Sequence, residues 1–151
     1  MSINLDLQLA SDAELIPSLA AFQHWAEHAL QDHLETTELC IRVVDEAESQ
    51  QLNHDYRGID KPTNVLSFPF EAPPEIELNL LGDLAICAPL VARQAEEQGK
   101  ILEHHWAHLV THGILHLLGY DHIDDEDAQT MEALETRLLA GLNIADPYLE
   151  G

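Results

Sequence analysis

The run from Thr111 to His122, THGILHLLGYDH, constrains this chain more than any other segment. Four residues separate His112 from His116, so a helix here places both imidazoles on one face, about one turn apart. Gly119 predicts the end of this helix, because glycine readily adopts the left-handed conformation that reverses the chain. His122, three residues further on, can then return toward the same face. The run therefore predicts a helix, a tight turn and three imidazoles that converge on one point.

Three histidine ligands without a fourth protein ligand are typical of a catalytic zinc site, in which water or substrate takes the open position. The sequence thus predicts one Zn²⁺ ion bound by His112, His116 and His122. His108 also lies four residues before His112, so the spacing alone permits a site shifted by one turn. Only the downstream set has the turn at Gly119 to bring in a third ligand.

Gly113 stands where the His-Glu-x-x-His zinc proteases carry their glutamate general base. Without a carboxylate at this position, peptide hydrolysis by that route is disfavoured. A glycine inside a helix also costs about 1 kcal/mol relative to alanine. Its presence beside a ligand predicts that another group approaches the helix backbone closely.

Alternation of apolar and polar residues and short apolar runs predict four strands in the first part of the chain. Pro69 cannot donate to a central ladder, which places its strand at a sheet edge or at a strand end. Gly82 predicts a bulge in the last strand. Residues 71–77, rich in proline and glutamate, are typical of a loop. The predicted strands cover residues 3–9, 39–43, 62–70 and 80–87.

Helical spacing of apolar residues and helix-ending signals predict five helices. Gly58 predicts the end of the second helix, and the acidic residues from Asp124 to Asp127 predict the start of the last, where the helix dipole favours negative charge. The predicted helices cover residues 15–30, 45–56, 89–98, 101–118 and 125–142.

Strands and helices alternate early in the chain, and helices dominate late. This order predicts an α+β fold, with a small mixed β-sheet of about four strands packed with about five or six helices. No repeat or linker divides the sequence, so we expect residues 1–151 to form a single catalytic domain.

The net charge of −22, from 28 acidic and 6 basic residues, limits how this chain can bind nucleic acid. Phosphate contacts normally need clustered lysine and arginine, and the basic residues here are scattered. We therefore expect no tight unaided binding to nucleic acid. The charge indicates either a surface adapted to solubility or high salt, or a need for a basic protein partner. The basic residues are Arg42, Arg57, Lys61, Arg93, Lys100 and Arg137.

The N-terminus has no basic region followed by an apolar core, and no stretch approaches the ~18 apolar residues of a membrane span. Two cysteines in the chain provide no disulfide framework. These features predict a cytoplasmic protein without a membrane partner.

Five segments of the chain together resemble a known family. They are LN at 52–53, YR at 56–57, PTNVLSFP at 62–69, LGDL at 81–84 and HGILHLLGYDH at 112–122. The resemblance is to the YbeY family of bacterial endoribonucleases, also called rRNA maturation factors. It extends over nearly the whole chain and rests on specific motifs.

This resemblance implies zinc bound by His112, His116 and His122, a catalytic arginine at Arg57, and an α+β fold with a metzincin-like metal site. It also implies a metal-dependent endoribonuclease, specific for single strands. Such an enzyme would act in rRNA maturation, including the 3′ end of 16S rRNA, and in ribosome quality control. The implied partners are single-stranded RNA or rRNA, and the small ribosomal subunit or a basic ribosomal protein.

The chemistry of these residues suits that reaction. Zinc lowers the pKa of bound water toward ~7. Arg57 supplies a fixed charge and a planar fork suited to phosphate, and Lys61 is close enough in sequence to add to it. We expect zinc-bound water, or a substrate 2′-hydroxyl activated by it, to attack the phosphodiester while Arg57 stabilises the developing charge.

Several alternatives stay open from the sequence. Arg57 can also be a surface residue that caps a helix C-terminus. The whole protein can be a zinc peptidase on a metzincin-like scaffold, which would need a carboxylate base from elsewhere. It can also be a non-catalytic ribosome-assembly or metal-binding module, although structural zinc usually takes four protein ligands.

Overall fold

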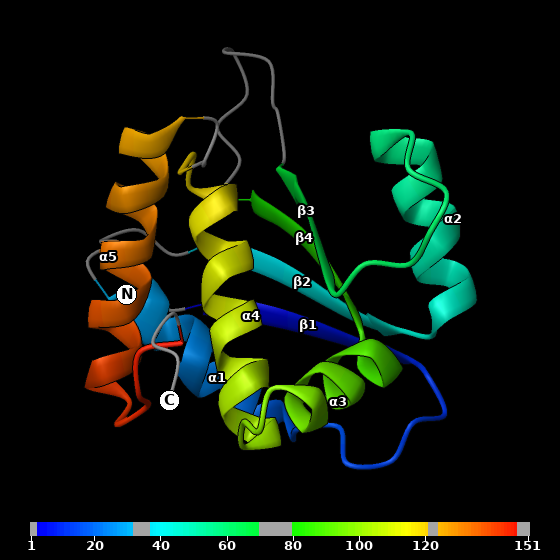
Figure 1. Cartoon of the computed structure of the whole chain (residues 1–151), viewed down its shortest axis with the longest axis horizontal. Coiled ribbons are helices and arrows are strands. Elements are labelled where there is room, and N and C mark those ends of the chain that lie inside the picture. Colours follow the sequence, from blue (N-terminus) through cyan, green and yellow to red (C-terminus); the bar gives the residue numbers. More distant parts are fainter. Residues whose placement is uncertain (1–2, 32–36, 70–79, 121–123, 148–151) are drawn as a thin grey trace.

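The computed structural model describes residues 3–31, 37–69, 80–120 and 124–147. Within these ranges the chain forms four strands and five helices, which confirms the predicted α+β class (Figure 1). The strands are β1 (Ile3–Ala10), β2 (Thr37–Val44), β3 (Val65–Pro69) and β4 (Leu80–Cys87). The helices are α1 (Leu19–Ala29), α2 (Glu46–Arg57), α3 (Ala88–Glu97), α4 (Leu102–Leu117) and α5 (Asp125–Gly141).

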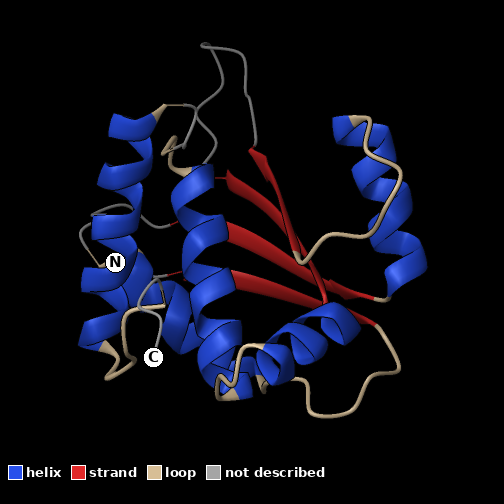
Figure 2. Cartoon of the chain, in the orientation of Figure 1, coloured by secondary structure: helices blue, strands red, loops and turns tan. Residues whose placement is uncertain are grey.

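The strands form one mixed sheet in the order β1-β2-β4-β3 (Figure 2). β1, β2 and β4 are parallel, and β3 pairs antiparallel with β4 at the edge. The edge position agrees with the prediction from Pro69, which has no N–H to donate to a further strand. The predicted irregularity near Gly82 is also present. Glu38 pairs with Leu80 but Leu39 pairs with Gly82, so β4 carries one extra residue there.

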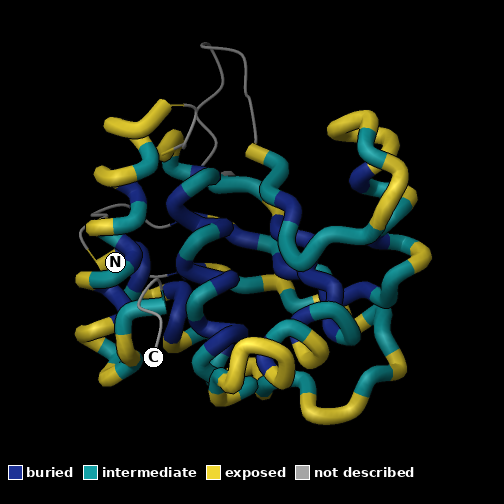
Figure 3. The backbone as a smooth tube through the Cα atoms, viewed as in Figure 1, coloured by how far each residue is buried: buried dark blue, intermediate teal, exposed yellow. Residues whose placement is uncertain are grey.

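One face of the sheet packs against α4, which lies across it (Figure 1). Ile41, Val43, Leu84 and Ile86 of the central strands are fully buried in this layer. α4 also contacts α1, α3 and α5, and most of its residues are buried (Figure 3). α4 is therefore held from several sides, which makes it a rigid support for the histidines it carries.

Gly113 allows α4 to lie close to the sheet. A Cβ atom at this position would come within 2.7 Å of Leu84 Cδ2, closer than van der Waals contact permits. The Ser67 hydroxyl of β3 donates to the Gly113 carbonyl at 3.2 Å. The close approach that the glycine predicted is thus confirmed, and the approaching group is Leu84 of β4. This contact sets the height of the neighbouring histidines above the sheet.

The first helix begins later than predicted. Its apolar spacing suggested residues 15–30, but α1 starts at Leu19. The Ser18 hydroxyl accepts from the Ala21 N–H and caps the helix, while Leu15 has φ = 63° and cannot continue a right-handed helix. The capping bond of Ser18, rather than the apolar spacing, therefore determines where α1 begins.

Two other helix boundaries agree with their sequence signals. α2 ends before Gly58, which has the left-handed φ of 72°. α5 begins after Asp124, whose carboxylate accepts from the Asp127 N–H at 2.8 Å. No helix in the described ranges combines the length and apolar character needed to cross a membrane.

Candidate active site

His112 and His116 lie one turn apart on α4, as their spacing predicted. Their Nε2 atoms are 3.1 Å apart, and both side chains line the same groove. Two nitrogen ligands of one tetrahedral zinc ion, each about 2.05 Å from the metal, would be about 3.3 Å apart. The observed separation therefore fits a pair of ligands to a single ion.

The turn after α4 has the predicted form. Gly119 has φ = 104°, and its N–H donates to the His116 carbonyl at 3.0 Å. The Tyr120 N–H donates to the Leu115 carbonyl, also at 3.0 Å. These bonds satisfy the last carbonyls of the helix and reverse the chain. His122 follows this turn and lies outside the described residues, so its role as the third ligand stays a prediction.

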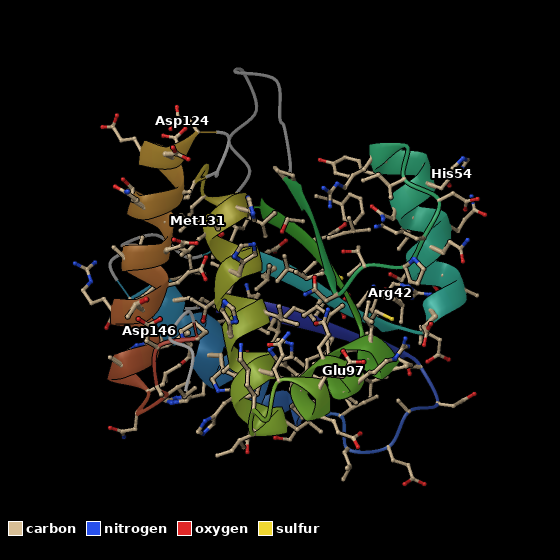
Figure 4. The ribbon with its side chains drawn as sticks, in the orientation of Figure 1. Arg42, His54, Glu97, Asp124, Met131 and Asp146 are labelled. Atoms are coloured by element: carbon tan, nitrogen blue, oxygen red, sulfur yellow. The ribbon has the colours of Figure 1, made fainter. Side chains whose placement is uncertain are left out.

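Glu135 of α5 is the residue that sequence reasoning missed. Its side chain is 0% exposed, and its two oxygens lie 2.7 Å from His112 Nδ1 and 2.9 Å from His108 Nε2. Met131, labelled in Figure 4, is on the same buried face of α5 and packs with Leu115 of α4. The apolar contacts of this face place the carboxylate directly against the histidine helix.

Glu135 determines how the His112 ring presents its nitrogens. An ionised carboxylate only accepts hydrogen bonds, so His112 Nδ1 carries the proton and donates to it. The Nε2 atom then holds the lone pair, directed toward His116 and the groove. A buried carboxylate that fixes the tautomer of a ligand in this way is the usual partner of metal-binding histidines.

His108, His112 and Glu135 also form a set that could hold a metal ion, because their ligand atoms all lie within 4.8 Å of one another. This set corresponds in part to the alternative site shifted by one turn. Its N···O separations of 2.7 and 2.9 Å are typical hydrogen-bond lengths, shorter than the roughly 3.3 Å expected between two ligands of one zinc ion. The geometry thus favours Glu135 as a hydrogen-bond acceptor and the Nε2 side of His112 as the metal-binding side.

A groove of about 620 Å³ runs beside these histidines. β3 and β4 lie between α4 and α2, so the groove has residues of both helices in its walls (Figure 1). None of the described residues that line it is an aspartate or a glutamate, although the chain has a net charge of −22. The lining residues are Tyr56, Arg57, Thr63, Asn64, Val65, Leu66, Ser67, Pro69, His108, Leu109, His112, His116, Gly119 and Tyr120.

Arg57 is the last residue of α2 and lines this groove, so the structure brings it to the same site as His112 and His116. In the described part of the chain its guanidinium makes no hydrogen bond or ion pair. Arg42 and Arg93, in contrast, pair with Glu48 and Glu46. Arg57 also lies in the last turn of α2, where the helix dipole favours a positive charge, but within the described residues it donates no hydrogen bond to a carbonyl of the helix end, so the capping alternative stays a prediction. Lys61 is exposed and does not line the groove.

His105, a further histidine of α4, is buried in the core. Burial, assisted by the nearby charges of His108 and Lys100, lowers its pKa from 6.5 to about 4. Its Nε2 atom lies 3.1 Å from Gln94 Oε1, which also accepts from the Asn64 amide at 3.2 Å. His105 is thus a neutral structural residue that helps to position Asn64 in the groove wall.

The signal that could have revealed Glu135 lies in the pattern of its helix. Met131, Glu135, Leu138 and Leu139 are all buried and share one face of α5. A single carboxylate on an otherwise apolar face requires a buried partner, because an unpaired buried charge is very costly. The sequence alone does not show which partner this is.

Comparison with known proteins identifies the family of this chain. The family model described as "Endoribonuclease YbeY" matches residues 8–143, which include Arg57 and the three histidines of the 112–122 run. The chain is also similar to the solution structure of TM1509 from Thermotoga maritima, a target protein also called VT1. The two are 24% identical, the match covers 95% of this chain and 99% of TM1509, and the TM-score is 0.58. At that identity the likeness concerns the fold. The extent of the family match shows that this chain belongs to the YbeY family of endoribonucleases, enzymes that hydrolyse RNA.

Proposed function

We propose that this protein is a metal-dependent endoribonuclease that cleaves single-stranded RNA during rRNA maturation. The observation that carries this proposal is the groove whose lining includes both Arg57 of α2 and the two histidines of α4, His112 and His116, with their Nε2 atoms 3.1 Å apart. One wall offers a positive charge for phosphate and the other offers metal ligands. The family match supplies the reaction class.

The metal that fits this donor set best is a single zinc ion. His112 and His116 would bind it through Nε2, and His122 would provide the third ligand. Support comes from the 3.1 Å separation of the two Nε2 atoms and from the bond between Glu135 and His112 Nδ1. When bound, zinc supplies a Lewis acid and lowers the pKa of coordinated water.

Arg57 would bind the phosphate that is cleaved and stabilise the negative charge that develops on it. Its guanidinium makes no other interaction in the described residues and can form two parallel hydrogen bonds to phosphate oxygens. The groove lining has no described carboxylate to repel the phosphate or to act as the base of a peptidase. These features favour phosphodiester cleavage over peptide cleavage.

The nucleophile would be either water or the 2′-hydroxyl of the substrate. The two leave different ends: attack by the 2′-hydroxyl produces a cyclic phosphate, whereas direct attack by water does not. Mass spectrometry of the cleaved ends distinguishes the two routes, and a cyclic phosphate would rule out direct attack by water.

The acidity of the chain supports action with a basic partner. With six basic residues against 28 acidic ones, long-range attraction to RNA is weak. We infer that the small ribosomal subunit or a basic ribosomal protein brings the enzyme to its RNA, which would include the 3′ end of 16S rRNA. Tight binding of the purified protein to naked RNA at physiological salt would contradict this inference.

The central experiment combines metal analysis with cleavage of a single-stranded RNA oligonucleotide. The wild type should contain about one zinc ion per chain and cleave the RNA. Arg57→Ala should keep metal and fold but cleave roughly 10²–10³-fold more slowly, as for loss of one charge-stabilising donor. His116→Ala should lose metal and activity together. Full activity of Arg57→Ala would contradict the proposal, and peptide cleavage without RNA cleavage would indicate the peptidase instead.

A further inference from the structure

Two exposed aromatic side chains line the groove. In the described part of the chain, Tyr56 and Tyr120 are the large aromatic residues that are exposed, at 54% and 38%. Tyr56 precedes Arg57 near the end of α2, and Tyr120 follows the turn that ends α4. Two tyrosines from separate elements thus border the cavity that holds Arg57, His112 and His116.

Tyr56 is held in place although it is exposed. Its ring lies 4.6 Å from that of Phe68 on β3, with the ring planes inclined at 59°. This contact restricts the rotation of the Tyr56 side chain before any ligand binds. A ring held in this way loses little entropy when a second flat group packs against it.

Tyr120 is positioned through its backbone. Its N–H donates to the Leu115 carbonyl, and Gly119 before it takes up the reversal of the chain. The hydrogen bonds that end α4 after His116 therefore also fix the position of the Tyr120 backbone, from which its side chain extends. Tyr56 is held by a ring contact and Tyr120 by its backbone, but both side chains line the groove.

The charges of the groove indicate how RNA can be held there. Arg57 is the only lysine or arginine among the described lining residues, so the groove offers a single fixed positive charge to the phosphates. Single-stranded nucleic acid also binds by stacking its bases on aromatic side chains, a contact that needs no particular base and has no charge of its own to supply. Bases within a duplex are already stacked on one another and cannot make this contact.

We propose that Tyr56 and Tyr120 form two base-stacking subsites of the groove, each binding one nucleobase of a single-stranded RNA whose phosphate contacts Arg57. This proposal rests on the proposed function. Under this proposal, the two tyrosines recognise unpaired RNA. Because stacking adds binding energy that does not depend on positive charge, it also accounts for how so acidic a chain holds RNA at its site.

The test measures KM and kcat for a short single-stranded RNA and for versions with one abasic residue at successive positions. The abasic residue removes the base but keeps the 2′-hydroxyl. At the position of a stacked base, the abasic RNA should raise KM of the wild type by roughly 5- to 100-fold. Tyr56→Leu and Tyr120→Leu should raise KM for intact RNA by a similar factor, with a much smaller change in kcat.

Testing a tyrosine variant on an abasic RNA identifies which base that tyrosine contacts. If Tyr56 stacks on a given base, Tyr56→Leu and removal of that base should together cost no more than either change alone. Leucine keeps an apolar contact with Phe68, so the fold is retained, and Tyr56→Trp should restore KM. Leu19→Ala serves as the control, because Leu19 is 52% exposed and does not line the groove.

Two negative results are distinguishable. Failure of the wild type to cleave intact single-stranded RNA would refute the proposed function. Normal cleavage with the same KM for wild type, Tyr56→Leu and Tyr120→Leu would overturn the stacking proposal alone. The stacking proposal would also be overturned if, at every position, the effects of the tyrosine variant and of the abasic residue on KM multiplied, as they do for independent changes.

Discussion

The carboxylate of Glu135 and the imidazole of His112 form a 2.7 Å hydrogen bond that connects α5 to α4. Glu135 is fully buried, and its other oxygen lies 2.9 Å from His108 Nε2. The bond leaves His112 Nε2 facing His116 across 3.1 Å. The last long helix therefore orients the ring of His112, a predicted metal ligand on the neighbouring helix, without lining the groove itself.

Glu135→Gln should weaken metal binding by 10–100-fold, the usual cost of losing a residue that orients a ligand. Glutamine keeps the size of the side chain but removes its charge, so His112 loses its strong acceptor. Competition with a chelator measures the change in affinity. Glu132→Gln on the same helix is the control, because Glu132 is only partly buried. Equal metal affinity of Glu135→Gln and wild type would contradict the orienting role.

Replacement of single histidines should separate the two possible ligand sets. His116→Ala and His122→Ala should each lower the zinc content well below one ion per chain, because each removes a predicted ligand. His108→Ala should keep close to one ion, since His108 contacts Glu135 and is not one of the three predicted ligands. Native mass spectrometry gives the stoichiometry. Loss of zinc from His108→Ala with retention in His116→Ala would identify the shifted site instead.

Gly113→Ala should destabilise the protein, although alanine is the better helix former by about 1 kcal/mol. The new Cβ would come within 2.7 Å of Leu84 Cδ2, and overpacking of this kind typically costs 1–3 kcal/mol. Urea denaturation measures the free energy of unfolding. Leu84→Ala removes the clashing methyl group, so the double variant should be more stable than the sum of the two single changes predicts. Strict additivity would show that α4 and β4 are not in close contact.

Stability should fall as the pH drops from about 6.5 toward 4, in part because of His105. Its pKa is lowered to about 4 in the folded protein, so the unfolded chain takes up the proton first and is favoured at acid pH. Urea denaturation at several pH values should show a shallower decline for His105→Gln, which keeps a donor for Gln94. An unchanged pH profile in this variant would argue against a buried neutral imidazole.

Much of the local structure could be predicted from short stretches of the chain. Gly58 ends α2 and Asp124 caps α5 because these effects involve residues within one helical turn. The pairing of His112 and His116 follows in the same way from the geometry of a helix. The predicted start of α1 was wrong because the apolar pattern continues on the N-terminal side of Ser18. The capping bond of Ser18 determines where the helix begins.

The sequence by itself therefore determined the order of strands and helices, the two converging imidazoles of α4 and the family to which the chain belongs. Only the tertiary structure decided that Arg57 shares a groove with those imidazoles, that Glu135 faces His112, and that Tyr56 rests on Phe68. These contacts join separate elements of the fold. They depend on the strand order β1-β2-β4-β3 and on how closely α4 packs on the sheet and α5 on α4, which local spacing does not specify.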